Sequence, residues 1–218
     1  MPVVLIANPK GGVGKSTLAT HVAGYFANQG HAVMLGDVDR QQSSRLWLGL
    51  RPAQVAPIQG WDAEGEEGLL RPPRGTTHAV LDSPAGLHGK RLKQVLALAD
   101  QVLVPLQPSL FDIYATSDFV HRLLERTEGK AGKRVALVGM RVGGRTLAAG
   151  QLREFVARLD VPVVTELRDT QNYVQLAARG LTLFDVAPGR VQRDLAQWEP
   201  LMRWLDGRPA GPAASGNP

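Results

Sequence analysis

The sequence contains no cysteine and no long hydrophobic run. Without cysteine the chain cannot form disulfides or thiolate metal sites, and this composition fits a reducing cytoplasm. A membrane-spanning helix needs roughly 18 consecutive apolar residues, and no stretch approaches that length. The N-terminus also lacks the basic segment followed by an apolar one that is typical of a targeting signal. We therefore expect a soluble, cytoplasmic protein.

The chain has 218 residues, enough for one sizeable α/β domain. Its 25 Lys and Arg outnumber its 20 Asp and Glu, which gives a net charge of +5. A basic balance of this size favours an acidic partner, and nucleic acid is the obvious one. Ordinary solubility explains the same charge equally well, so charge alone does not choose between these explanations.

Apolar, strand-like segments alternate with helical segments along almost the whole chain. The expected strands lie near residues 3–8, 32–37, 78–82, 101–106, 134–139 and 162–165. The expected helices lie near residues 16–29, 41–49, 88–98, 111–127, 147–159, 171–179 and 191–206. Strands that are apolar throughout suit a parallel sheet covered on both faces. The order therefore predicts a doubly wound α/β fold with a mainly parallel sheet and helices on both faces.

Two segments fall outside this alternation. Residues 51–76 are rich in proline and glycine, and we expect a loosely structured excursion with one short helix there. Residues 207–218 are rich in Gly, Pro, Ala and Ser, which predicts a disordered tail. The expected organisation is a single domain over residues 1–206 followed by this tail.

The most informative stretch reads Lys-Gly-Gly-Val-Gly-Lys-Ser-Thr and lies between the first strand and the first helix. Glycines allow the backbone to turn its N–H groups inward, and the helix N-terminus adds its dipole, so the loop suits a polyphosphate. In such a P-loop Lys15 reaches the β- and γ-phosphates, Ser16 offers its hydroxyl to Mg²⁺, and Thr17 bonds an α-phosphate oxygen. The other expected contacts come from the loop residues Gly11, Gly12, Val13 and Gly14.

Acidic residues end two further strands. Asp37 and Asp39 follow one strand, and strand alternation places both on the same side, where they can face a metal ion and the γ-phosphate. Asp82 ends the next strand. Taken alone, two acids at a strand end are more often a helix N-cap and a solvated turn. The P-loop upstream favours a catalytic role instead.

These motifs resemble the ParA/MinD family of partitioning and positioning ATPases over roughly residues 1–200. Pro9 stands where the strict P-loop pattern has glycine, and the pair Lys10 and Lys15 resembles the deviant Walker A motif of that family. The resemblance implies ATP and Mg²⁺ as ligands. It also implies an ATP-dependent homodimer in which Lys10 crosses the interface to the phosphates of the other subunit.

The resemblance also suggests roles for residues at the other strand ends. Asp39 would help to position or activate the attacking water, Asp37 would lie near the Mg²⁺ shell, and Asp82 looks like the Walker B aspartate that holds Mg²⁺ through a water. Arg168 lies in a segment similar to the family loop that touches adenine. Arg141 stands where several relatives place an asparagine near the base, which leaves a base contact at this position open.

The mechanism implied is slow ATP hydrolysis used as a timer, with Lys10, Lys15 and Asp39 as catalytic residues. No glutamate stands in a strong-base position, so we expect weak intrinsic activity and a stimulating partner. The family resemblance suggests a ParB-like or other adaptor protein. The ATP-bound dimer would pair two basic surfaces and bind double-stranded DNA nonspecifically, at the nucleoid, in plasmid or chromosome segregation or cargo positioning.

As a hypothesis, the DNA-binding face contains Arg168, Arg179, Arg190 and Arg193. A MinD-like membrane-cycling ATPase is the alternative, because residues 191–206 place apolar residues on one side of a helix. Core packing explains that stripe better, since the polar side carries more acidic than basic residues and Pro200 interrupts it. A membrane partner is therefore disfavoured. An amide-forming synthetase of the same fold would need a second substrate pocket, for which the chain has little room.

Overall fold

The computed structural model describes residues 1–208 except 66, 67, 70, 128–132, 144–146, 158 and 160. Its centre is a seven-stranded, all-parallel sheet in the order β3-β2-β6-β1-β7-β8-β9. The strands of this sheet are β1 (Val3–Ile6), β2 (Val33–Asp37), β3 (Ile58–Trp61), β6 (His78–Asp82), β7 (Gln101–Leu106), β8 (Arg134–Gly139) and β9 (Val163–Glu166). The helices are α1 (Lys15–Asn28), α2 (Ser43–Gly49), α3 (Gly89–Leu98), α4 (Leu110–Thr127), α5 (Leu147–Val156), α6 (Gln171–Ala177), α7 (Pro188–Leu205) and the short 3-10 helix η1 (Leu183–Asp185).

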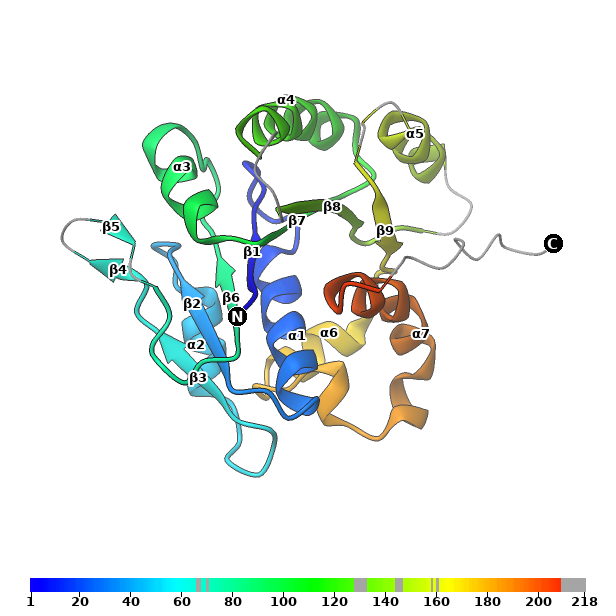
Figure 1. The fold of residues 1–218 in the computed structure, drawn as a ribbon. Helices are drawn as coiled ribbons and strands as arrows, with labels where there is room; N and C mark the ends of the chain where they lie inside the picture. The colour runs from blue at the N-terminus through cyan, green and yellow to red at the C-terminus, as the bar shows by residue number, and fades with distance from the viewer. Residues whose placement is uncertain are drawn as a thin grey trace.

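The sheet is buried on both faces. Because successive side chains of a strand point to opposite faces, β1 contributes to two separate cores. Val3 and Leu5 join the core formed with α3 and α4, whereas Val4 and Ile6 join the core formed with α1 and α7. Figure 1 shows α3, α4 and α5 along one face of the sheet, and α1, α2, α6 and α7 along the other. The doubly wound fold expected from the apolar strands is confirmed.

The six expected strands and seven expected helices are all present, with ends that differ by a few residues. The expectation for residues 51–76 was wrong in two ways. β3 joins the sheet there as an edge strand, a small antiparallel hairpin of β4 (Glu64–Gly65) and β5 (Gly68–Leu69) follows, and the described part of this segment contains no helix. Only Ile58 and Trp61 of β3 are buried, so its apolar signal was too short to detect. The strand is held by its pairing with β2, where Gly36 leaves the space that the Trp61 ring occupies.

The apolar stripe of α7 packs into the core. This agrees with the expectation that the stripe is a packing surface rather than a membrane-binding one. Trp198, Leu201 and Leu205 are buried on its inner side. The helix continues through Pro200 and bends near its start, where Val191 has non-helical dihedral angles. No helix among the described residues combines the length and apolar character needed to cross a bilayer. Of the expected tail, residues 209–218 lie outside the described residues.

The order in which successive strands are added to the sheet changes direction next to β1, which lies between β6 and β7. Ligands in open α/β sheets bind beyond the carboxyl ends of the strands at such a point. The P-loop follows β1, while Asp37 and Asp82 end the neighbouring strands β2 and β6 and are paired in register. The fold therefore places all three motifs at one edge of the sheet.

Candidate functional site

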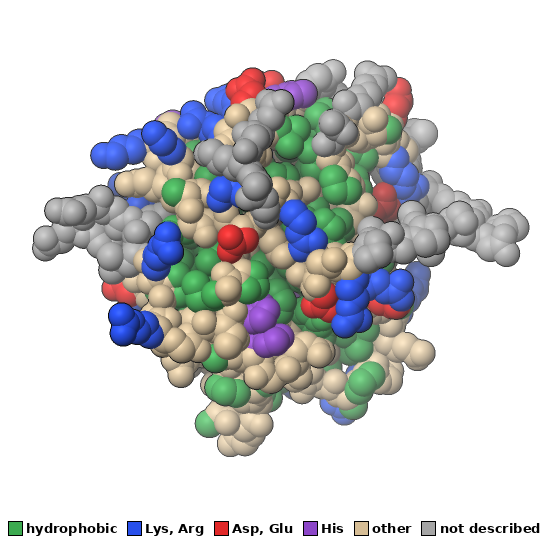
Figure 2. Space-filling view, in the orientation of Figure 1, with side chains coloured by type: hydrophobic (Ala, Val, Ile, Leu, Met, Phe, Trp, Pro, Cys, Tyr) green, Lys and Arg blue, Asp and Glu red, His purple; other side chains and the backbone are tan. Residues whose placement is uncertain are grey.

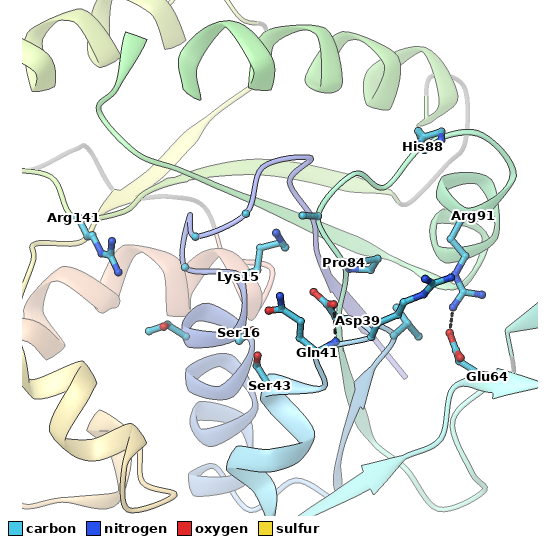
Figure 3. A pocket seen from close by; sticks show the side chains of 17 residues that line it. Lys15, Ser16, Asp39, Gln41, Ser43, Glu64, Pro84, His88, Arg91 and Arg141 are labelled. Atoms are coloured by element: carbon cyan, nitrogen blue, oxygen red, sulfur yellow. Dashed lines mark hydrogen bonds and ion pairs between the residues drawn. The ribbon is translucent and has the colours of Figure 1, made fainter. Parts of the chain in front are cut away.

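A cleft of about 1140 Å³ opens beside these strand ends (Figure 3). It brings together the P-loop, the segment after β2 and the segment after β6, which lie far apart in the sequence. The lining residues are Gly11, Gly12, Gly14, Lys15, Ser16, Thr17, Val38, Asp39, Arg40, Gln41, Ser43, Glu64, Pro84, Ala85, His88, Arg91 and Arg141. Most of the expected P-loop contacts and Asp39 therefore face one shared space.

Two glycines give the P-loop its path. Gly12 and Gly14 have φ values of 75° and 93°, in the left-handed region that other residues rarely adopt. A Cβ atom on Gly14 would also lie 2.7 Å from Cε of Met140. The loop can thus lie against the end of β8 and lead directly into α1, which begins at Lys15. The N-terminus of this helix then adjoins the cleft, where it favours an anion.

Lys15 lies inside the loop rather than in solvent. Its side chain is only 7% exposed, and Nζ donates a hydrogen bond of 2.7 Å to the carbonyl oxygen of Lys10. Burial lowers the pKa of Lys15, and the negative charges of Asp82 and Asp39 oppose that shift. The ammonium group thus lies within the electrostatic influence of both carboxylates, in the middle of the cleft.

Asn8 anchors the start of the P-loop, and sequence reasoning missed it. The residue is fully buried. Its Nδ2 donates to the carbonyl oxygen of Pro105 at 2.7 Å and to Oγ1 of Thr116 at 3.1 Å, while its Oδ1 accepts from the backbone N–H of Lys10 at 2.8 Å. The available signal was a single polar residue directly after an apolar strand. Asn8 thus ties the loop to β7 and α4.

Asp37 and Asp39 have different surroundings although they are two residues apart. Both oxygens of Asp37 accept backbone hydrogen bonds: Oδ1 from Asp39 at 2.9 Å, and Oδ2 from Ser44 at 2.9 Å and Arg45 at 3.2 Å. Asp37 therefore satisfies donors in the first turn of α2, as the cap reading of two strand-end acids anticipates. Burial raises the pKa of Asp37, and these hydrogen bonds counteract the rise. Asp39, in contrast, lines the cleft, with Oδ1 accepting from Gln41 N–H at 3.0 Å.

Asp82 is nearly inaccessible, with 1% of its surface exposed. Its Oδ2 accepts a hydrogen bond of 2.7 Å from the hydroxyl of Ser44. Its Oδ1 is buried and has no hydrogen-bond partner among the described residues. Burial raises the pKa of Asp82 to about 6, and the hydroxyls of Ser44 and Ser16 beside it counteract the rise.

An unsatisfied buried carboxylate oxygen beside the Ser16 hydroxyl fits a hard cation such as Mg²⁺. Within the described ranges, no group of three or more His, Cys, Asp or Glu side chains could hold a metal ion by itself. Mg²⁺ binds through one or two protein oxygens together with phosphates and waters, so it does not require such a group. Ser16 and Asp82 would be the residues that hold Mg²⁺ here. Asp37, paired in register with Asp82, would lie near them.

Five of the expected site residues do not line the cleft: Lys10, Val13, Asp37, Asp82 and Arg168. Lys10 is half-buried at the start of the loop. Nε of Arg168 forms an ion pair of 2.6 Å with Oδ1 of Asp194, a fully buried residue of α7. Asn172 donates to the other oxygen of Asp194 at 2.6 Å. The predicted contact of Arg168 with the nucleotide stays a prediction.

The cleft also contains basic residues that the P-loop reading did not assign to it. Arg40 follows Asp39, and Arg91 of α3 forms an ion pair with Glu64 of the hairpin (Figure 3). Glu64 could not be placed from the sequence, because the hairpin itself was not predicted. Together with Lys15 and Arg141, these side chains give the cleft walls an excess of positive charge, which suits an anionic ligand.

Comparison with known proteins agrees with this geometry. A family model described as the CobQ/CobB/MinD/ParA nucleotide binding domain (CbiA) matches residues 4–183. The chain is 26% identical over 195 residues to the maintenance of carboxysome distribution protein A of Halothiobacillus neapolitanus, covering 87% of this chain and 90% of that protein. It is 29% identical to the chromosome-partitioning ATPase Soj of Thermus thermophilus, over 68% of this chain and 73% of that protein.

Solved structures share the fold at low sequence identity. A chain of the MinC:MinD cell division protein complex of Aquifex aeolicus has a TM-score of 0.70 and 18% identity, with 98% of each chain covered. The cell division ATPase MinD of Pyrococcus furiosus has a TM-score of 0.71 and 17% identity, covering 94% of this chain and 98% of that chain. At these identities the likeness establishes the arrangement of sheet and helices alone.

Proposed function

The chain belongs to the CobQ/CobB/MinD/ParA nucleotide-binding family, and from that premise we propose that it is a ParA-like positioning ATPase that hydrolyses ATP. The observation that carries the proposal is that Lys15 and Asp39 line one cleft while Asp82 lies buried beside it, close enough for both carboxylates to act on the pKa of the ammonium. A cation for phosphate oxygens, a buried acid for a metal ion and an accessible acid for water are the parts that phosphoryl transfer requires.

ATP would bind with its phosphates over the P-loop. The backbone of residues 11–14 and the N-terminus of α1 would surround the phosphates, Lys15 would contact the β- and γ-phosphates, and Thr17 the α-phosphate. Ser16 and Asp82 would hold Mg²⁺, which neutralises phosphate charge when bound. Arg168 stays a proposed contact on the nucleoside side, with its guanidinium oriented by Asp194.

Asp39 would orient the attacking water, because it is the aspartate that lines the cleft beside Lys15. Catalysis would rest on orientation of the water by this carboxylate and on stabilisation of the phosphoryl charge. We therefore propose a slow intrinsic rate that a partner protein increases. A ParB-like or other adaptor protein is the proposed partner.

A second copy of the chain would dock across the nucleotides in the ATP state, with Lys10 contacting the phosphates of the other subunit. The dimer would present two copies of each basic surface to DNA, and nonspecific affinity would rise steeply because it depends on counterion release. Figure 2 shows Lys and Arg dispersed over one face with acidic residues between them, so the charges on this face do not by themselves mark a DNA surface. The proposed face contains Arg168, Arg179, Arg190 and Arg193.

The names of the relatives indicate two classes of cargo for this chain, a protein complex or a DNA molecule. One relative is named for carboxysome distribution and another for chromosome partitioning. We propose that this chain positions a protein complex or a DNA molecule on the nucleoid. Membrane cycling is the weaker alternative, because the apolar stripe of α7 is buried against the sheet.

The test is binding to nonspecific double-stranded DNA with ATP, with ADP and without nucleotide, for the wild type and Lys10→Ala. Binding that requires ATP and is lost in Lys10→Ala would support the dimer switch. Absence of binding in every state would contradict the partitioning function. In that case ATP-dependent flotation with liposomes would distinguish the membrane alternative.

A further inference from the structure

Arg141 is a cleft residue that the proposed mechanism leaves without a role. Its φ is 54°, and Gln42 is the only other non-glycine residue with positive φ in the part of the chain that the structure describes. A left-handed conformation is uncommon for a residue with a long side chain, and it persists only where the surroundings determine it. Residues held in this way are frequent at ligand sites.

The neighbours of Arg141 determine its backbone. Met140 N–H donates to the carbonyl oxygen of Leu106 at 2.8 Å, at the end of β7. Val142 N–H donates to the carbonyl oxygen of Leu167 at 2.9 Å, just after β9. Met140 is also buried against the P-loop at Gly14. Arg141 is thus fixed between two strand ends, beside the loop that would hold the phosphates.

The position of Arg141 in the cleft indicates which part of a nucleotide it would meet. Figure 3 shows Arg141 on the opposite side of Lys15 and Ser16 from Asp39. The terminal phosphate must lie toward Asp39 if that residue orients the water. The nucleoside must then extend from the P-loop in the other direction, toward Arg141.

The guanidinium of Arg141 is available for a ligand. The residue is exposed, lines the cleft and has no ion pair or side-chain hydrogen bond among the described residues. Arg168 follows Leu167, the residue whose carbonyl accepts from Val142, but its Nε is held by Asp194. Among the described residues that line this side of the cleft, Arg141 is therefore the cation whose guanidinium no other side chain holds.

We propose that Arg141 reads the N7 edge of a purine base, so that the site accepts guanine as well as adenine. A guanidinium has five N–H donors and no acceptor. Adenine offers it N7, but the 6-amino group of adenine is a donor and gains nothing from it. Guanine offers both N7 and O6, the edge that arginine recognises in nucleic acids. This inference rests on the proposed binding of a nucleoside triphosphate in the cleft.

The test measures displacement of a fluorescent ATP analogue, in the presence of Mg²⁺, by ATP, GTP, ITP, CTP and 7-deaza-ATP. For the wild type we expect GTP and ITP to bind up to about tenfold more tightly than ATP, because they offer O6 as well as N7, and CTP and 7-deaza-ATP to bind about tenfold more weakly than ATP, the loss of one good base contact. Arg141→Asn presents both a donor and an acceptor, and should favour ATP over GTP by about tenfold. Asparagine tolerates the left-handed conformation, so this variant should fold.

Arg122→Asn is the matched control, because Arg122 is an exposed arginine of α4 that does not line the cleft. It should keep the wild-type ratio of ATP to GTP affinity. A wild type that binds GTP more weakly than ATP, or an unchanged ratio in Arg141→Asn, would overturn the role of Arg141 while leaving ATP binding intact. If no triphosphate displaces the analogue, or the analogue itself does not bind, the proposed function fails together with this inference.

Discussion

The hydroxyl of Ser44 donates a hydrogen bond of 2.7 Å to Oδ2 of Asp82, while the backbone N–H of the same residue donates to Oδ2 of Asp37 at 2.9 Å. A single residue in the first turn of α2 therefore connects the acidic ends of β2 and β6. Because Asp82 is expected to hold Mg²⁺, Ser44 links the expected metal site to α2. This short helix carries Leu46 and is followed directly by Leu50, both exposed apolar residues.

Ser44→Ala tests this connection. Removing the hydroxyl leaves Oδ2 of Asp82 buried without its donor, and a hydrogen bond to a charged group contributes about 1.5–3 kcal/mol. We expect the free energy of unfolding at pH 7 to fall by about that amount, measured by urea denaturation. Ser43→Ala is the control, since the neighbouring Ser43 is exposed and should change stability by less than about 0.5 kcal/mol. Equal effects of both variants would contradict the importance of the Ser44 hydrogen bond.

Asp82→Asn should stabilise the nucleotide-free protein at neutral pH. Burial raises the pKa of Asp82 from 3.8 to about 6, so the folded state binds more protons than the unfolded state between these values. Asp82 therefore lowers stability progressively as pH rises through this window, and the loss persists above it. One pKa unit corresponds to about 1.36 kcal/mol, which predicts a gain for Asp82→Asn of about 1–3 kcal/mol at pH 7.

The measurement is urea denaturation of both proteins from pH 4 to pH 8 without nucleotide. The difference in free energy of unfolding should be small near pH 4, grow up to about pH 6 and then stay constant. With ATP and Mg²⁺ added, the wild type should gain stability and Asp82→Asn should not, because the amide is a poor Mg²⁺ ligand beside the carboxylate it replaces. A destabilised Asp82→Asn at pH 7 would show that the ionised carboxylate has a stabilising partner in the folded protein.

Asn8→Ala should weaken nucleotide binding, although the Asn8 side chain does not line the cleft. The side chain orders the P-loop through its hydrogen bonds to Pro105, Thr116 and Lys10, so its removal leaves buried polar groups unpaired, at about 1–3 kcal/mol for each such group. We expect lower thermal stability and a reduced ATP affinity in titration calorimetry. Ser109→Ala, which alters a half-buried residue after β7, is the control and should preserve ATP affinity. An unchanged affinity in Asn8→Ala would mean that the loop keeps its shape without this anchor.

The parts of the site that the sequence predicted are those that a contiguous motif carries. Residues 10–17 are recognisable because phosphate binding, the turn and the start of α1 depend on neighbours in the chain. Asn8, Ser44 and Glu64 are not, because their roles depend on residues that the fold brings close: Thr116, Asp82 and Arg91. Strand β3 was missed for the same reason. It has only two buried residues, and it forms a strand because the fold places β2 beside it. Continuously apolar segments predicted the sheet itself, because strands buried on both faces are apolar throughout.

The structure also changes how the DNA-binding hypothesis should be tested. Arg179, Arg190 and Arg193 are exposed and can be replaced by alanine together. Arg168 cannot be treated in the same way, because Arg168→Ala would leave the buried Asp194 without its cation, which typically destabilises a protein by about 3–5 kcal/mol. Loss of DNA binding in a variant that includes Arg168→Ala would therefore not separate a DNA contact from unfolding.

The triple variant Arg179→Ala/Arg190→Ala/Arg193→Ala should bind nonspecific double-stranded DNA much more weakly in the ATP state and hydrolyse ATP at the wild-type rate. If each arginine contacts a phosphate, the slope of log affinity against log salt concentration should fall by about 0.9 for each, or about 2.7 for each subunit. Lys93→Ala/Arg122→Ala/Arg126→Ala removes the same charge from α3 and α4, on the other face of the sheet. If the loss of net charge alone weakens binding, both triple variants should lose affinity equally. Only a loss confined to the first variant supports a DNA surface formed by α7 and the segment that follows α6.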